Sequence, residues 1–81
     1  MIVRLKLFAV AKELAGRDEL SFDLPASATI ADLRQAAIAA VPALAKIIPH
    51  SLWAIDTSYA ADNTPIAPHS EIALIPPVSG G

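Results

Sequence analysis

The residues that could most clearly take part in a chemical reaction lie at the end of the sequence, which reads Pro76-Pro77-Val78-Ser79-Gly80-Gly81. The two prolines favour an extended backbone and the two glycines have no side chains, so this tail could thread a narrow channel in another protein. Its terminal carboxylate is ionised at neutral pH. Such a group can attack the α-phosphate of ATP to form an acyl-adenylate, which a sulfur or nitrogen nucleophile then opens. A Ser-Gly-Gly ending is also common in frayed termini, so its meaning depends on the domain that carries it.

Side-chain chemistry elsewhere in the chain is sparse. His50 and His69 each follow a proline and have no neighbours at metal-ligand spacing, so we expect them in surface loops and expect no metal site. The sequence has no cysteine, which excludes a thiol nucleophile and a Cys-ligated metal. Asp18, Glu19 and Asp23 are typical of a solvated strand edge. No Gly-x-Ser-x-Gly elbow and no phosphate-binding loop occurs. We therefore expect no catalytic apparatus and no cofactor.

The first 25 residues predict two strands joined by a short helix. Residues 2–8 alternate with period two, which indicates a half-buried strand. The face opposite its apolar residues carries Arg4, Lys6 and Phe8. Residues 9–15 favour a helix that ends at Gly16, and residues 18–24 alternate again until Pro25 stops the strand. Because the connection is short, the two strands should lie antiparallel.

A longer helix is predicted to begin at Thr29. Asp32 completes a near capping box with Thr29 and also suits the positive end of the helix dipole. Apolar residues then recur at helical spacing as far as Pro42, which should end or kink the helix. Residues 43–48 favour one further turn.

The last third of the chain predicts shorter strands. Residues 51–55 indicate a third strand, with Trp53 in the core or at a partner contact. Residues 56–63 resemble a turn, and residues 64–66 favour a very short strand. Glu71–Ile75 is predicted to be the last strand, which the two prolines end.

This order of elements predicts an α+β fold of the β-grasp, or ubiquitin-like, type. A chain that begins and ends in strands, with one main helix between them, packs that helix across a single mixed sheet. The compact arrangement places the first and last strands side by side and parallel, with one sheet face covered and the other open. We expect one domain over residues 1–76 and a flexible tail over residues 77–81.

The composition excludes several classes of function. Hydrophobic residues make up 54% of the 81 residues and charged residues only 17%, so an exposed apolar patch for a partner is plausible in so small a domain. The net charge is -2 and the six cations are scattered, which argues against nucleic-acid binding. No apolar run is long enough to span a bilayer, and cations interrupt the apolar start, which is unlike a signal peptide. We expect a soluble, cytoplasmic protein with no membrane partner.

The ending Ala73-Leu74-Ile75-Pro76-Pro77-Val78-Ser79-Gly80-Gly81 resembles that of the small, sulfur-carrying subunits of molybdopterin synthase, a ubiquitin-like family. The opening Leu7-Phe8-Ala9, followed by Glu13-Leu14-Ala15-Gly16, is also similar to this family. The similarity covers the whole length, including the helix led by Thr29. The Pro-Pro-Val-Ser-Gly-Gly ending is its most specific part.

The resemblance implies a defined sulfur-transfer sequence. An ATP-dependent activating enzyme would adenylate Gly81, and a sulfurtransferase would supply the sulfur that converts the adenylate into a thiocarboxylate. The carrier would then dock on the large synthase subunit with its tail inserted in that subunit's pocket. The threading residues would be Pro76, Pro77, Val78, Ser79 and Gly80. Sulfur would pass there to cyclic pyranopterin monophosphate, building the dithiolene of molybdopterin for molybdenum cofactor biosynthesis. Two carriers and two large subunits would form a heterotetramer, and the catalytic side chains would belong to the large subunit.

A docking face is expected beside the tail. If the first and last strands are neighbours, Phe8 and Ile75 emerge together on the open face, and Tyr59 can join them. The resemblance implies that such an apolar patch binds both the large subunit and the activating enzyme. Arg4 and Lys6 on the same face would add electrostatic steering. The alternative is that Phe8 and Ile75 pack beneath the short helix of residues 9–15.

Two positions depart from the family pattern. His69-Ser70-Glu71 stands where Gly-Asp-Glu is usual, and Asp56 stands where asparagine is frequent. Both lie away from the tail, so we expect altered turns and an unchanged function.

Three other interpretations stay open. The first is a carrier for thiamine or another thiolation pathway, although thiamine carriers are usually shorter and lack the Pro-Pro. The second is a ubiquitin-like modifier joined through Gly81 to lysines of target proteins. The third is a β-grasp interaction module whose diglycine is incidental.

Overall fold

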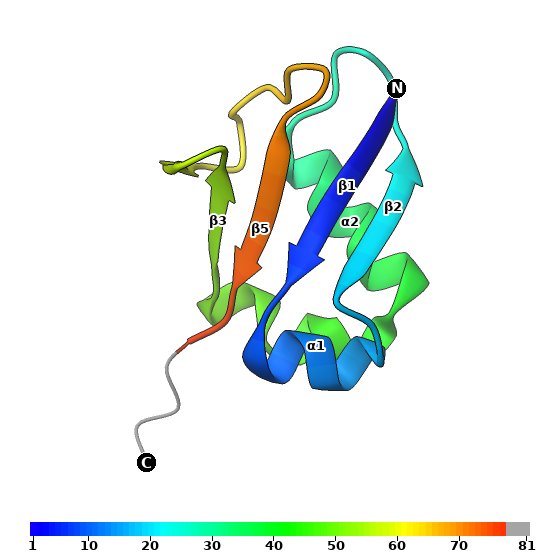
Figure 1. Ribbon diagram of the computed structural model, residues 1–81, viewed down its shortest axis with the longest axis vertical. Helices are drawn as coiled ribbons and strands as arrows, with labels where there is room; N and C mark the ends of the chain where they lie inside the picture. Colours follow the sequence, from blue (N-terminus) through cyan, green and yellow to red (C-terminus); the bar gives the residue numbers. More distant parts are fainter. Residues whose placement is uncertain (78–81) are drawn as a thin grey trace.

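The computed structural model describes residues 1–77, which form a five-stranded mixed sheet with a helix across one face. The strands are β1 (Ile2–Leu7), β2 (Glu19–Asp23), β3 (Leu52–Ile55), β4 (Ser58–Ala60) and β5 (Glu71–Ile75). Their order is β2-β1-β5-β3-β4, with β1 and β5 parallel and the other neighbouring pairs antiparallel (Figure 1). The first and last strands are therefore central, and the predicted β-grasp fold is confirmed.

The core lies between the sheet and helix α2 (Ile30–Ala40), which crosses behind the strands in Figure 1. The predicted alternation holds in β1, whose odd-numbered residues are buried. The buried side chains of the two central strands and of α2 are Val3, Leu5, Leu7, Ile72, Leu74, Ile30, Leu33 and Ala37. Fully burying one large aliphatic side chain contributes roughly 1.5–3 kcal/mol, so this layer supplies most of the stabilisation of a chain without disulfides.

Capping contacts predicted from the sequence mark one end of each α-helix. Helix α1 (Ala9–Ala15) ends at Gly16, whose φ of 70° is left-handed and whose amide donates to the Lys12 carbonyl at 2.9 Å. At the start of α2, the Thr29 amide donates to the Asp32 carboxylate at 2.9 Å and completes the capping box. These contacts mark where α1 ends and where α2 begins.

The connection between α2 and β3 contains two 3-10 helices, whose turns are tighter than those of an α-helix. Helix α2 ends before Pro42, and two 3-10 helices follow, η1 (Pro42–Lys46) and η2 (Ile48–His50). Each has a proline among its first two residues, where the missing amide hydrogen is not needed. The expected single turn over residues 43–48 is therefore replaced by two short ones.

The prediction of a turn over residues 56–63 was wrong in its middle. Ser58–Ala60 forms β4, which pairs antiparallel with β3 across a two-residue turn. Three residues are too few to produce a visible period of two, so pairing with β3 rather than local pattern defines this strand. Residues 64–66, predicted as a very short strand, contribute only a single bridge between Pro65 and Thr29.

The described chain ends just beyond β5. Pro76 is buried and Pro77 is exposed, so Pro76 belongs to the packed body of the domain. Val78, Ser79, Gly80 and Gly81 lie outside the described residues. None of the helices within residues 1–77 has the length and apolar character that a bilayer crossing requires.

Candidate docking face and tail exit

The sheet face opposite α2 is open, and strand register determines which side chains share it. Residues paired across neighbouring strands project from the same face. Ile75 of β5 lies opposite Leu52 of β3, and Ala73 lies opposite both Ala54 of β3 and Lys6 of β1. Across the last pair of strands, Ala54 lies opposite Tyr59. One continuous surface therefore runs across four strands.

The part of this face nearest the end of β5 is apolar. Phe8, which follows β1, is 49% exposed, Tyr59 is 74% exposed, and Ile75 is half-buried. The register places Phe8 next to Ile75, because Leu7 and Leu74 are the pair immediately before them. The structure thus places the three apolar residues that the sequence singled out on one face, with Phe8 next to Ile75 and Tyr59 on the edge strand two strands away from β5. The exposure of Phe8 also argues against its packing beneath α1.

Leu52 is a fourth member that sequence reasoning missed. Its side chain is 52% exposed and lies directly opposite Ile75. Trp53, the next residue, points the other way and is 3% exposed, so it belongs to the core. Alternation alone could have put either residue outside, and only the pairing of β3 with β5 decides between them. We call Phe8, Leu52, Tyr59 and Ile75 the apolar patch.

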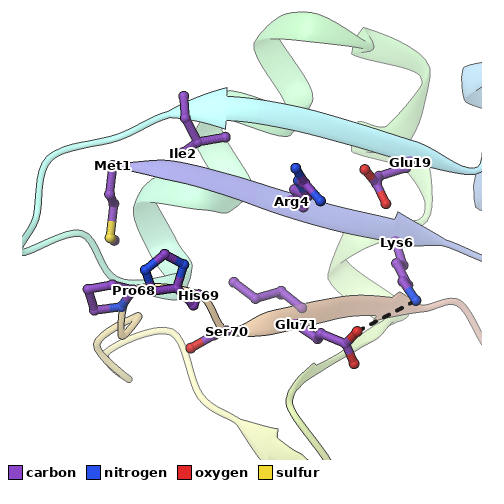
Figure 2. A pocket seen from close by; sticks show the side chains of 10 residues that line it. Met1, Ile2, Arg4, Lys6, Glu19, Pro68, His69, Ser70 and Glu71 are labelled. Atoms are coloured by element: carbon purple, nitrogen blue, oxygen red, sulfur yellow. Dashed lines mark ion pairs between the residues drawn. The ribbon is translucent and has the colours of Figure 1, made fainter.

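The other end of the open face is charged and slightly hollowed, as Figure 2 shows. Arg4 of β1 lies opposite Glu71 of β5, Lys6 lies opposite Glu19 of β2, and His69 lies at the rim. The Lys6 Nζ atom is 3.9 Å from the Glu71 carboxylate, and both side chains are exposed. A pair this open contributes little stability. Arg4 is exposed and forms no ion pair with any residue between 1 and 77.

This hollow does not have the make-up of a catalytic or metal site. Its cations and carboxylates are mixed, so it favours neither an anion nor a cation. His50 and His69 are both exposed, as expected. Over residues 1–77, no three His, Cys, Asp or Glu side chains lie close enough to hold a metal ion together. The arrangement suits a polar rim beside a docking surface.

The point where the tail leaves the domain is fixed by the parallel pairing of β1 and β5. The carboxyl ends of both strands lie at the same end of the sheet, where β1 passes into α1 (Figure 1). The chain therefore leaves β5 beside Phe8 and Leu52, and Pro77 is the first exposed residue after Ile75. The functional group that the sequence suggests, at Gly81, lies outside the described residues, as do Val78, Ser79 and Gly80. What the described residues do establish is that the tail starts next to the apolar patch.

Both departures from the family pattern fall at residues with left-handed backbone. His69 has a φ of 65° and Asp56 a φ of 57°. Glycine adopts this conformation at no steric cost, which histidine does not, whereas asparagine and aspartate both tolerate it. His69 precedes β5 and Asp56 follows β3, so both lie near the start of β5, at the end opposite the tail exit.

Comparison with known proteins is consistent with this architecture. The chain is 35% identical over 83 residues to the "Molybdopterin synthase sulfur carrier subunit" of Chlamydomonas reinhardtii, covering 100% of both chains. The crystal structure of SAMP1 from Haloferax volcanii superposes with a TM-score of 0.90 at 32% identity, again over 100% of both chains. A protein–protein complex of subunits 1 and 2 of the molybdopterin-converting factor from Helicobacter pylori contains a chain with a TM-score of 0.70 at 22% identity, over 100% of both chains, which shows a shared fold. The family model described as "ThiS family" matches residues 5–81, and the chain belongs to that family.

Proposed function

We propose that this chain is the sulfur carrier subunit of a molybdopterin synthase. The observation that carries the proposal is the placement of β5, which delivers the tail from the centre of the sheet to a point beside the exposed apolar patch. A sulfur carrier needs an exposed apolar patch and a tail that starts beside it, because the protein that binds the domain must also receive its C-terminus. The full-length similarity to a sulfur carrier subunit supports the same conclusion.

The chemistry resides in the terminal carboxylate of Gly81. Its oxygen attacks the α-phosphorus of ATP, pyrophosphate leaves, and a glycyl-adenylate forms. A hydrosulfide ion then attacks the carbonyl carbon, AMP leaves and the S–H proton is lost to solvent, which yields a thiocarboxylate. The chain contributes no catalytic side chain to either step. An activating enzyme binds the ATP, and a sulfurtransferase provides the sulfur.

The thiocarboxylate is delivered by docking. The apolar patch binds the large subunit of the synthase, and the tail reaches that subunit's pocket, where cyclic pyranopterin monophosphate accepts the sulfur. Pro77, Val78, Ser79 and Gly80 thread the pocket. Pro76, expected from the sequence among the threading residues, is buried in the domain, and we assign it the role of an anchor that fixes the direction of exit.

Intact-mass measurement tests this function. After incubation with ATP, a molybdopterin-type activating enzyme and a sulfur donor, the protein should gain the mass that replaces one oxygen atom by sulfur. A variant lacking Gly81 should gain nothing. Addition of the large subunit and the pterin precursor should then return the mass to its original value. A wild-type mass that stays constant with every activating enzyme tried would rule the proposal out.

A second candidate function has a specific observation in its favour. SAMP1, the archaeal structural neighbour with a TM-score of 0.90, is named a small archaeal modifier protein in a second crystal structure, from the same organism. In a modifier, the ε-amine of a target lysine would attack the glycyl-adenylate, AMP would leave, and an isopeptide bond would form. The same activation mixture separates the two functions, because conjugates of higher mass on other proteins would appear in place of the thiocarboxylate.

A further inference from the structure

Two alanines lie opposite each other within the apolar half of the open face. Ala54 of β3 pairs with Ala73 of β5, and both are half-buried. We call them the alanine pair. Around them the register places larger side chains: Tyr59 is opposite Ala54, while Leu52 and Ile75 lie two residues further along the same two strands. Members of the apolar patch thus border the alanine pair on two sides, while Lys6 of β1 and the Asp56–Glu71 end of the two strands border it on the others.

Because alanine is smaller than its apolar neighbours, we expect the alanine pair to be the lowest part of this surface. An alanine projects only a methyl group above the sheet, whereas leucine, isoleucine and tyrosine project much further. A flat partner resting on the larger side chains would leave unfilled space over the two methyl groups. Such space forfeits dispersion contacts, and well-packed interfaces avoid it. The complementary surface must therefore project at this point.

We propose that the alanine pair receives one apolar side chain that projects from the large subunit of molybdopterin synthase. This inference rests on the proposed function and adds the shape and chemistry of the partner's contact. The occupant is apolar because the two methyl groups and the sides formed by Tyr59 and by Leu52 with Ile75 are apolar. On the other two sides, Lys6 interacts with Glu71 at 3.9 Å and the Asp56 carboxylate accepts a hydrogen bond from the Glu71 amide, so these charged groups already have counterparts.

The position next to the tail argues for this particular partner. Ile75 borders the alanine pair, and the chain leaves the domain two residues later at Pro77. A protein that accepts the tail in its own pocket must sit against this end of the sheet. The surface over Ala54 and Ala73 is therefore continuous with the surface from which the tail departs.

Enlarging an alanine gives a test in which shape and hydrophobicity have opposite effects. Ala73→Leu adds apolar area to the patch but fills the space proposed for the partner's side chain. If shape matters, the dissociation constant for the purified large subunit should rise at least tenfold. Ala54→Leu should have the same effect, since it fills the same space from the neighbouring strand. If the apolar patch bound its partner through hydrophobic area alone, and not through shape, either change would leave binding unchanged or strengthen it.

Ala73→Ser is the matched control, because it keeps the side chain small and should bind within about threefold of wild type. Thermal melts of all three variants should stay near the wild-type value, since the positions are half-buried on the open face. Binding by Ala73→Leu and Ala54→Leu as tight as that of wild type would overturn the inference while leaving the proposed function in place. Failure of the wild-type chain both to bind the large subunit and to acquire sulfur would overturn the two together.

Discussion

The amide of Asp56 donates a hydrogen bond to the carbonyl of Glu71 at 2.7 Å, and the amide of Glu71 donates one to the Asp56 carboxylate at 3.0 Å. These two bonds tie the turn between β3 and β4 to the first residue of β5. Asp56 also has a φ of 57°, a conformation that aspartate and asparagine tolerate better than most residues. One side chain therefore helps to turn the chain and to fix the start of the strand that leads to the tail.

Asp56→Asn and Asp56→Ala should separate these contributions. Asparagine keeps an oxygen acceptor for the Glu71 amide and accepts a positive φ, so the free energy of unfolding should change by less than about 0.5 kcal/mol. Alanine removes the acceptor and strains the turn, and should lower that free energy by about 1–2 kcal/mol. Urea denaturation measures both. An equal loss in the two variants would show that the negative charge matters and the hydrogen bond does not.

His69→Gly should stabilise the protein. A residue with a Cβ atom pays roughly 1–2 kcal/mol for a left-handed conformation, and His69 has a φ of 65°. Glycine removes this strain at some cost in unfolded-state entropy, so we expect a gain of about 0.5–1 kcal/mol and a melting temperature higher by several degrees. His69→Ala removes the imidazole but keeps the Cβ atom, and should give no gain. Equal stabilisation by both changes would assign the effect to the imidazole.

Features set by short stretches of sequence were predictable, and features set by long-range pairing were not. Gly16 and the Thr29–Asp32 capping box act within one helical turn, so the end of α1 and the start of α2 followed from the sequence. β4 exists only because Tyr59 and its neighbours pair with β3. The hydrogen bonds of Asp56 likewise depend on a strand that begins fifteen residues later.

Some residues of the candidate docking face could likewise be predicted from the sequence, and others could not. Phe8 and Ile75 could be placed together because a β-grasp fold makes their strands neighbours, and the register of β1 and β5 agrees with that placement. Leu52 could not be assigned, because Leu52 and Trp53 are both large and apolar and only one of them faces the core. Ala54 and Ala73 gave no local signal at all, since their relation is a register between two strands.

Leu52→Asp should weaken docking without unfolding the domain. The side chain is 52% exposed in the free protein, so a charge there remains hydrated, but docking would bury it against apolar surface. Binding to the large subunit, measured by titration calorimetry, should weaken at least tenfold, or by about 1.4 kcal/mol. Leu14→Asp is the matched control, because Leu14 is 38% exposed on α1 and lies outside the apolar patch. Equal weakening by both variants would remove Leu52 from the docking surface.

Arg4→Gln should slow association with the large subunit more than it speeds dissociation. Arg4 has no ion-pair partner within residues 1–77, so its charge is available to steer a partner toward the open face. Stopped-flow measurements at low salt should show an association rate constant lower by about two- to fivefold, and this difference should shrink as salt screens the charge.

Lys6→Gln should have a smaller effect on the association rate constant, because Glu71 already offsets the Lys6 charge. Arg17→Gln, at an exposed position between α1 and β2, lowers the net charge by the same amount and controls for the overall field. If Arg4→Gln and Arg17→Gln slow association equally, net charge alone accounts for the rate and the open face has no steering role of its own.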